Sequence, residues 1–279
     1  MALVMVLALT ALTSCGATGN GSSGDKAAAG DRAAAGGRSG TTGNASSGKG
    51  GSSSGERTRQ RTQNLERLPD VGPALHRRIP AQSRQVLVVR GEGEDSAKST
   101  VFLYEKRENH EDPKNHEGVK NRKNHHNHRA TWDRTRSWPA HNGKRGWTTD
   151  HREGDKRSPV GVFTLSDAGG VLAAPDARLP YTHSPAFQAS RTWPKRYWHD
   201  FDHVIAIDYN RVRGTSPNDP NRPQGQSKGG YIWLHLDHGS GTSGCVSVSK
   251  SAMQYLLREL DPKAHPVIVM GDKGNLGSA

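Results

Sequence analysis

A histidine and a cysteine near the C-terminal end of the chain are the residues whose types and spacing could do chemistry. His235 lies near the end of an apolar run that starts at Tyr231, and Cys245 follows a glycine-rich turn and begins a β-branched run. A cysteine reacts as the thiolate, and a neighbouring imidazole lowers the thiol pKa and accepts its proton. We therefore predict that Cys245 is a nucleophile and His235 its base. The alternative is that Cys245 is a small buried hydrophobic residue and His235 an edge histidine.

Strand alternation separates the two faces of the first run. Successive side chains of a strand point to opposite faces. The face that we expect to pack on the core carries only aliphatic residues, namely Ile232, Leu234 and Leu236. The other face carries His235 beside Tyr231 and Trp233, and we expect these two rings to line the substrate cleft. His238 follows in the turn, where it could assist His235.

The turn before the cysteine could stabilise the anion that forms during acyl transfer. Because Gly244 has no side chain, the backbone N–H groups of Gly244 and Cys245 could point at one spot, as an oxyanion hole requires. Thr242 or Ser243 could orient the imidazole or donate to the same anion. The stretch as a whole therefore predicts cysteine-dependent acyl transfer.

The first 15 residues read as a signal peptide. Their apolar run is too short to span a bilayer, and Leu12-Thr-Ser-Cys15-Gly resembles a bacterial lipobox, in which the cysteine is lipidated and becomes the mature N-terminus. This implies a lipid anchor at the extracytoplasmic face of the membrane. Cys15 and Cys245 are the two cysteines of the chain. Lipidation of Cys15 would leave Cys245 without an intramolecular disulfide partner, and a lone thiol in an exported protein suggests intermolecular pairing or a reactive role.

Composition divides the rest of the chain into a tether and one domain. Residues 16–79 are rich in Gly, Ser, Ala and charge, so we expect a disordered tether. Residues 80–275 hold short β-branched runs separated by turn signals, which predict a mostly β, sandwich-like or barrel-like domain with one or two helices. Runs at 85–90 and 99–105 predict a hairpin. A capping box at Ser251–Gln254 predicts a helix that ends near Leu260.

A His- and Asn-rich stretch at 109–128 interrupts the pattern of strands. It contains His110, His116, His125, His126 and His128. Such a tract could bind metal. We favour a surface insertion in a hairpin loop, because no two of these histidines share a convincing strand or helix, and we therefore assign no metal site.

The charge balance points to an anionic environment. The chain has 39 Lys and Arg against 27 Asp and Glu, a formal net charge of +12, which suits nucleic acid, anionic lipid or an anionic cell wall. The sequence has no zinc-finger spacing, basic heptads or aromatic RNA-binding signature. We therefore do not expect nucleic acid as a partner.

Two motifs, in this order, resemble the L,D-transpeptidase catalytic (YkuD-like) domain. Gly154-Asp155 … Ser158-Pro-Val-Gly-Val-Phe163 is similar to the family's Gly-Asp-x-x-Thr-Pro-x-Gly-x-Phe strand. Ile232-Trp-Leu-His235 … Thr242-Ser-Gly-Cys245 is similar to the cysteine signature of an exported branch of the family. The resemblance covers about residues 82–271. Ser243 stands where better-known members have a histidine.

This resemblance implies a reaction on peptidoglycan. Cys245 matches the nucleophile, His235 the base and Gly244 the oxyanion-hole glycine of a transpeptidase that forms 3→3 crosslinks between stem peptides, with no metal or organic cofactor. Carbapenems typically acylate the same cysteine in the family. We expect a monomer. Two alternatives stay open, an L,D-carboxypeptidase that trims stem tetrapeptides and a non-catalytic cell-wall-binding lipoprotein.

Overall fold

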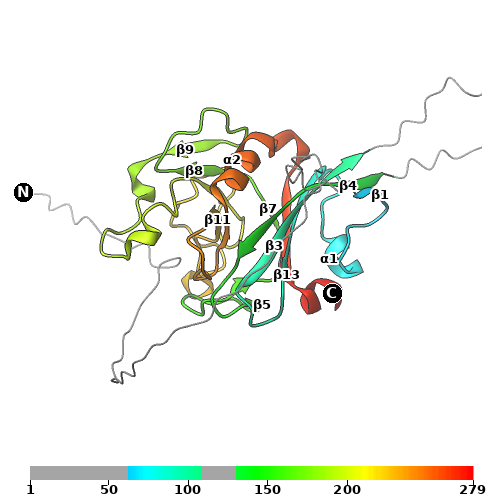
Figure 1. Ribbon diagram of the computed structural model, residues 1–279, viewed down its shortest axis with the longest axis horizontal. Helices are drawn as coiled ribbons and strands as arrows, with labels where there is room; N and C mark the ends of the chain where they lie inside the picture. Colours follow the sequence, from blue (N-terminus) through cyan, green and yellow to red (C-terminus); the bar gives the residue numbers. More distant parts are fainter. Residues whose placement is uncertain (1–61, 108–129, 279) are drawn as a thin grey trace, which may run out of the picture. The chain divides into compact units, whose positions relative to one another are not determined.

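A computed structural model describes residues 62–107 and 130–278 (Figure 1). The expected signal peptide with Cys15, residues 16–61 of the expected tether and the His-rich stretch at 109–128 lie outside this description. None of the helices in the described ranges is long and apolar enough to cross a membrane.

Most strands of the domain join one mixed sheet, which confirms the mostly β class. The strand order is β7-β13-β2-β3-β4-β12-β11-β10-β8-β9, and β1 pairs with β4 outside this path. The strands are β1 (Thr62–Leu65), β2 (Gln85–Gly91), β3 (Lys98–Arg107), β4 (Thr131–His141), β7 (Gly161–Thr164), β8 (Ala168–Gly170), β9 (Tyr181–His183), β10 (Val204–Ala206), β11 (Trp233–Leu236), β12 (Val246–Val248) and β13 (Val267–Asp272). A separate short pair is formed by β5 (Trp147–Thr148) and β6 (Ser158–Pro159).

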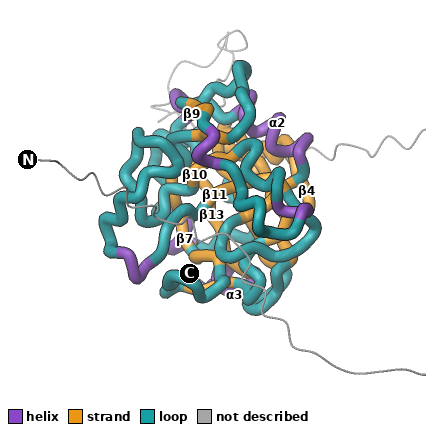
Figure 2. Tube along the Cα trace, turned by 90° about the vertical axis from the view of Figure 1, so that its left-hand side faces the viewer, coloured by secondary structure: helices purple, strands orange, loops and turns teal. Residues whose placement is uncertain are grey.

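Helices are few and short. The α-helices are α1 (Pro73–Arg77), α2 (Lys250–Glu259) and α3 (Lys273–Ser278), and single 3₁₀ turns occur at Pro185–Phe187, Lys195–Tyr197, Gln226–Lys228 and Pro262–Ala264. Figure 2 shows that loops, rather than long helices, cover the side of the sheet around β10 and β11.

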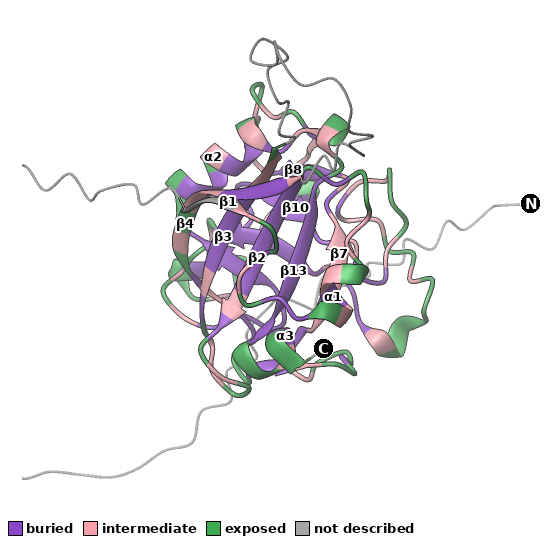
Figure 3. Cartoon of the chain, turned by 90° about the vertical axis from the view of Figure 1, so that its right-hand side faces the viewer, coloured by how far each residue is buried: buried purple, intermediate pink, exposed green. Residues whose placement is uncertain are grey.

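The predicted hairpin is confirmed as the antiparallel pair of β2 and β3, in register from Gln85 opposite Glu105 to Gly91 opposite Ser99. The β-branched run of β2 is buried on both faces, because Leu87 and Val89 pack in one hydrophobic cluster and Val86 and Val88 in another. Figure 3 shows β2 coloured as buried along most of its length.

The domain begins earlier than the sequence predicts. The expectation of a disordered tether through residue 79 is wrong for its last part, because β1 pairs with β4 and α1 follows. The side chains of Leu68, Val71 and Leu75 are buried in a cluster with residues of β2, β3, β4 and β13. Because these few apolar positions are spaced among charged residues, the composition suggested disorder, although the segment covers one face of the sheet.

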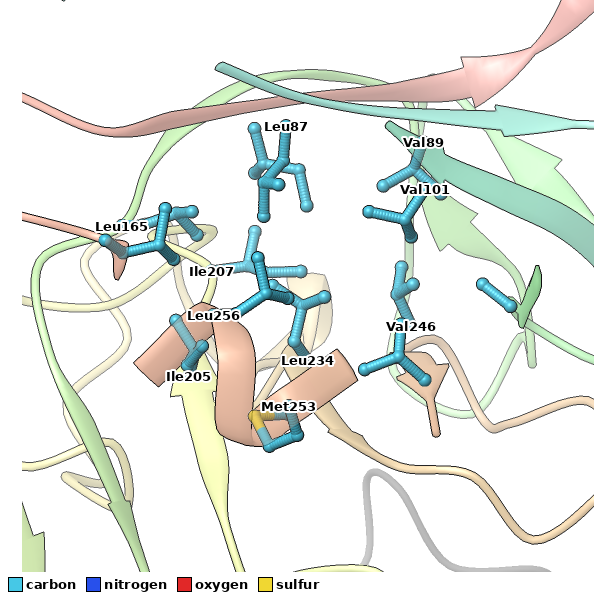
Figure 4. Packing of buried hydrophobic residues seen from close by; sticks show 14 of the residues in the cluster. Leu87, Val89, Val101, Leu165, Ile205, Ile207, Leu234, Val246, Met253 and Leu256 are labelled. Atoms are coloured by element: carbon cyan, nitrogen blue, oxygen red, sulfur yellow. The ribbon is translucent and has the colours of Figure 1, made fainter. Parts of the chain in front are cut away.

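Helix α2 covers the other face. Its N-cap is Ser249, whose Oγ accepts a hydrogen bond from the Ala252 N–H at 3.2 Å, so the helix begins before the predicted capping box at Ser251. The apolar side chains of Met253, Leu256 and Leu257 on this helix are buried, and Figure 4 shows Met253 and Leu256 near Leu234 of β11. The amphipathic pattern was sufficient to place the helix, since it depends on burial rather than on the exact cap.

Candidate active site

The site is built on two neighbouring parallel strands. β11 and β12 pair with Leu234 opposite Val246 and His235 opposite Ser247. The loop at 237–245 returns the chain from the end of one strand to the start of the other. Alternation in this register places Cys245 and His235 on the same face of the strand pair. In agreement, Leu234 and Val246 belong to the cluster on the α2 side, whereas Cys245 packs in a different cluster.

Cys245 is fully buried. Its sulfur accepts a hydrogen bond from the Trp233 N–H at 3.4 Å and lies 3.3 Å from the carbonyl oxygen of Tyr231. Cys245 must be present as the reduced thiol before it can act as a nucleophile.

His235 has the tautomer that a base requires. Its side chain is buried, and Nδ1 lies 2.9 Å from the carbonyl oxygen of Leu236. A carbonyl only accepts, so Nδ1 carries the proton and Nε2 keeps its lone pair. Nε2 is buried and has no hydrogen-bond partner among the residues described. Burial lowers the pKa of His235, and the carboxylate of Asp200 opposes this only in part, so the ring is neutral near pH 7.

The imidazole of His238 stacks on that of His235. The two ring centroids lie 6.2 Å apart, and the ring planes are 11° from parallel. Nδ1 of His238 lies 2.9 Å from Oδ2 of Asp200, and both side chains are almost completely buried. The edge of Tyr197 closes the other side at 4.6 Å between centroids. The structure thus brings the possible auxiliary histidine into contact with His235.

The turn before the cysteine is held by hydrogen bonds within itself. Oγ1 of Thr242 donates to the carbonyl oxygen of Cys245 at 2.6 Å and accepts from the Gly244 N–H at 3.1 Å. Thr242 thus engages the Gly244 N–H and orients the turn. The use of the Gly244 and Cys245 N–H groups in an oxyanion hole, and a role of Thr242 beside the imidazole, stay predictions. Ser243 is buried beside Thr242.

The two aromatic residues expected in the cleft differ in role. Trp233 is 2% exposed, contacts the ring of Phe201 at 5.4 Å and donates from Nε1 to the carbonyl oxygen of Pro217 at 3.2 Å. It packs as a buried residue, and its place in the substrate cleft stays a prediction. Tyr231 is partly exposed and has a φ of 54°. This left-handed conformation costs about 1–2 kcal/mol in a non-glycine residue. It also interrupts the predicted strand, so that β11 begins at Trp233 instead of Tyr231.

His151 is a candidate that the sequence reasoning missed. It is 4% exposed, its Nδ1 lies 3.0 Å from Oδ1 of Asp155, and a Cβ at Gly244 would lie 3.3 Å from its Cε1. Burial lowers the pKa of His151 against the opposing charge of Asp155. The neutral imidazole of His151 therefore lies beside the turn that precedes Cys245. The available signal was the four-residue spacing of His151 and Asp155 at the start of the Gly-Asp motif.

Comparison with protein families shows which domain carries this site. The model of the L,D-transpeptidase catalytic domain matches residues 121–269. The chain belongs to this family. No curated protein and no solved structure matches the chain. Membership implies L,D-transpeptidase-type activity on peptidoglycan stem peptides, and hence a location outside the cytoplasm. The matched region includes both motifs and all three histidines described above.

The first motif of this L,D-transpeptidase domain supports the second. Oγ of Ser158 donates to the carbonyl oxygen of Gly244 at 2.7 Å and accepts from the Gly143 N–H at 2.9 Å. Ser158 is completely buried. The Ser-Pro segment thus fixes the backbone that carries Cys245, which explains why the two motifs occur together although they are distant in the sequence.

Proposed function

We propose that the protein is a peptidoglycan L,D-transpeptidase that forms 3→3 crosslinks through a thioester at Cys245, with His235 as base. The observation that carries this proposal is the arrangement of His235. Its Nδ1–H is committed to the Leu236 carbonyl, so Nε2 keeps a lone pair on the face that also carries Cys245. Nε2 has no partner in the described part of the chain, and catalytic hydrogen bonds often form only once substrate is bound.

The reaction has two halves. In the first, Nε2 of His235 takes the thiol proton, and the thiolate attacks the carbonyl carbon of the diaminopimelate at position three of a stem peptide. The tetrahedral intermediate collapses to a thioester, and His235 returns the proton to the D-Ala nitrogen as that bond breaks. In the second half, an amine of a neighbouring stem attacks the thioester while His235 takes its proton. The thiolate leaves and regains the proton, and the enzyme is restored.

The neighbours of the base support this role. The carboxylate of Asp200 favours the imidazolium that forms in the transition state. His238 and Phe201 fix the ring from two sides. We assign His238 as a positioning residue and Thr242, Ser243 and Gly244 as the turn that orients the nucleophile.

We further propose that the enzyme acts as a monomer at the extracytoplasmic face of the membrane, held by a lipid on Cys15. A net charge of +12 suits an anionic cell wall. Stem peptides are the substrates, and no nucleic acid takes part.

Product analysis tests the proposal. Reduced protein is incubated with a disaccharide-tetrapeptide, and the products are separated and weighed by mass spectrometry. The proposal predicts crosslinked dimers and free D-Ala. Tripeptide monomers alone would instead identify a carboxypeptidase, for which water is the acceptor. No product, with Cys245→Ala behaving identically, would favour the non-catalytic cell-wall lipoprotein.

A further inference from the structure

An arginine on the loop that precedes β11 stacks on the tyrosine whose carbonyl contacts Cys245. The guanidinium carbon of Arg222 is 3.9 Å from the centroid of the Tyr231 ring. The carbonyl oxygen of the same tyrosine lies 3.3 Å from Sγ of Cys245. One residue therefore separates a fixed positive charge from the nucleophile.

The hydrogen bonds of Arg222 are incomplete. Nη1 donates to the carbonyl oxygens of Asp219 and Asn221, each at 2.8 Å. Nη2 is buried and has no partner within the described ranges. Guanidinium groups are always charged in proteins, and a buried N–H of a charged group without an acceptor is costly. Such a group is well suited to bind an acceptor that arrives with the substrate.

The loop is built to hold this guanidinium in place. A Cβ at Gly230 would lie only 1.9 Å from Nε of Arg222, so only glycine lets the side chain lie flat on the backbone there. The buried Asn210 anchors the same loop. Its Nδ2 donates to the carbonyl oxygens of Gly225 at 3.0 Å and Gly229 at 2.5 Å. The position of Arg222 is thus fixed before any ligand binds.

An acidic residue faces the arginine without neutralising it by an ion pair. Oε2 of Glu153 would lie 2.9 Å from a Cβ at Gly229, the neighbour of Gly230. Burial raises the pKa of Glu153, and the charge of Arg222 acts in the opposite direction. Among the described residues no salt bridge joins the two side chains. A carboxylate ligand could therefore reach Arg222 without first breaking a bond to Glu153.

We propose that Arg222 binds a carboxylate of the donor stem peptide through Nη2 and thereby sets donor specificity. This rests on the proposed function. The donor offers two carboxylates near the scissile bond, the C-terminal carboxylate of the leaving D-Ala and the free carboxylate of the diaminopimelate side chain. Either matches the planar fork of a guanidinium. Cys245 and Nη2 of Arg222 are both closed to solvent, so the groups that cover them must give way as substrate enters, while the loop keeps Arg222 in place.

The test compares Arg222→Gln with Arg136→Gln. Arg136 is a matched control, because its guanidinium also lies over a tyrosine, at 4.9 Å from the Tyr255 ring on α2. We measure kcat/KM of the reduced enzymes for three donors: the native tetrapeptide, its C-terminal amide, and the tetrapeptide with amidated diaminopimelate. The wild type and Arg136→Gln should prefer the native donor over one of the amides by about tenfold to a hundredfold. Arg222→Gln should lose that preference, and the amide concerned identifies the carboxylate.

Two results would overturn the proposal. One is that Arg222→Gln keeps the wild-type preference. The other is that it lowers kcat/KM equally for all three donors. Arg222→Lys keeps the charge but not the fork and should be intermediate, so it serves as a second variant should Gln disturb the fold. If the wild type turns over no donor, the proposed function fails separately. Calorimetric binding of the three donors to Cys245→Ala, with and without Arg222→Gln, then decides the role of Arg222.

Discussion

The two faces of the β11–β12 pair are equally buried and differ completely in chemistry. On the α2 side, Leu234, Val246 and Val248 pack in an aliphatic cluster (Figure 4). On the other side, Cys245 and His235 are 0% and 1% exposed, yet Nε2 of the imidazole lacks a hydrogen-bond partner within the described chain. Burial of an unsatisfied polar group destabilises a fold. The aliphatic face therefore stabilises the fold, whereas the face with Cys245 and His235 carries a buried polar group that lowers the stability of the fold.

The largest expected effect comes from replacing His235, the proposed base on the polar face, and it concerns the rate of thioester formation. His235→Asn keeps a polar side chain of similar reach but cannot accept the thiol proton. We expect the rate of thioester formation to fall by about 10²–10⁴-fold, measured in single turnover with reduced protein and a tetrapeptide donor. His151→Asn removes the imidazole beside the turn at Gly244 and serves as the control. It should lower the rate by less than about tenfold. If His151→Asn were the more damaging change, the base would be His151.

A substitution on the aliphatic side should change stability and leave the chemistry intact. Leu256 of α2 is completely buried, and Leu256→Ala should lower the free energy of unfolding by about 2–5 kcal/mol. Leu172 is 42% exposed, and the same substitution there should change it by less than about 0.5 kcal/mol. Urea unfolding measures both. Equal losses for the two variants would contradict the contrast between the faces.

Removal of the acidic neighbour should move the pH profile of the reaction. The charge of Asp200 raises the pKa of His235 against the effect of burial. Protonated His235 cannot act as a base, so Asp200→Asn should shift the acid limb of kcat/KM to lower pH. Asp176→Asn, at an exposed position, should leave the limb unchanged. A shift to higher pH would show that Asp200 does not act on the base through its charge.

The smallest effect concerns stability against pH. Burial lowers the pKa of His235 below its ordinary value of 6.5, so the unfolded chain binds a proton more readily than the folded one. The stability that neutral His235 contributes is therefore fully present above pH 6.5 and is lost as the pH falls below 6.5 towards the folded pKa. Because Asn does not titrate, the unfolding free energy of His235→Asn should fall less than that of the wild type as the pH is lowered through this range. The same dependence in both proteins would mean that His235 is not buried in its neutral form.

Sequence patterns predicted the parts of the molecule that depend on local alternation. The β2–β3 hairpin, the apolar face of α2 and the separation of Leu234 from His235 all follow from side-chain periodicity. Strand β10 ends at Ala206, although the apolar run continues to Ile207, and Asn210 anchors the loop that follows. Periodicity does not register a polar anchor of that kind.

The surroundings of the site could not be predicted in the same way. His151 and Arg222 lie near two neighbours of Cys245 only through the fold, His151 beside Gly244 and Arg222 over the ring of Tyr231. Their sequence contexts resemble ordinary charged loops. The use of Thr242 to hold the Gly244 N–H likewise depends on a tight turn whose geometry the residue types do not fix. The placement of Cys245 and His235 on one face could be predicted, because His235 lies on β11 and Cys245 directly precedes the neighbouring strand β12.

The central claim is that Cys245 forms a covalent acyl-enzyme. Intact-protein mass spectrometry of the reduced protein after incubation with a carbapenem tests it directly. We predict one adduct per chain, mapped to Cys245 by peptide digestion and missing in Cys245→Ala. Reduced wild-type protein without an adduct, or an equal adduct on Cys245→Ala, would contradict the claim.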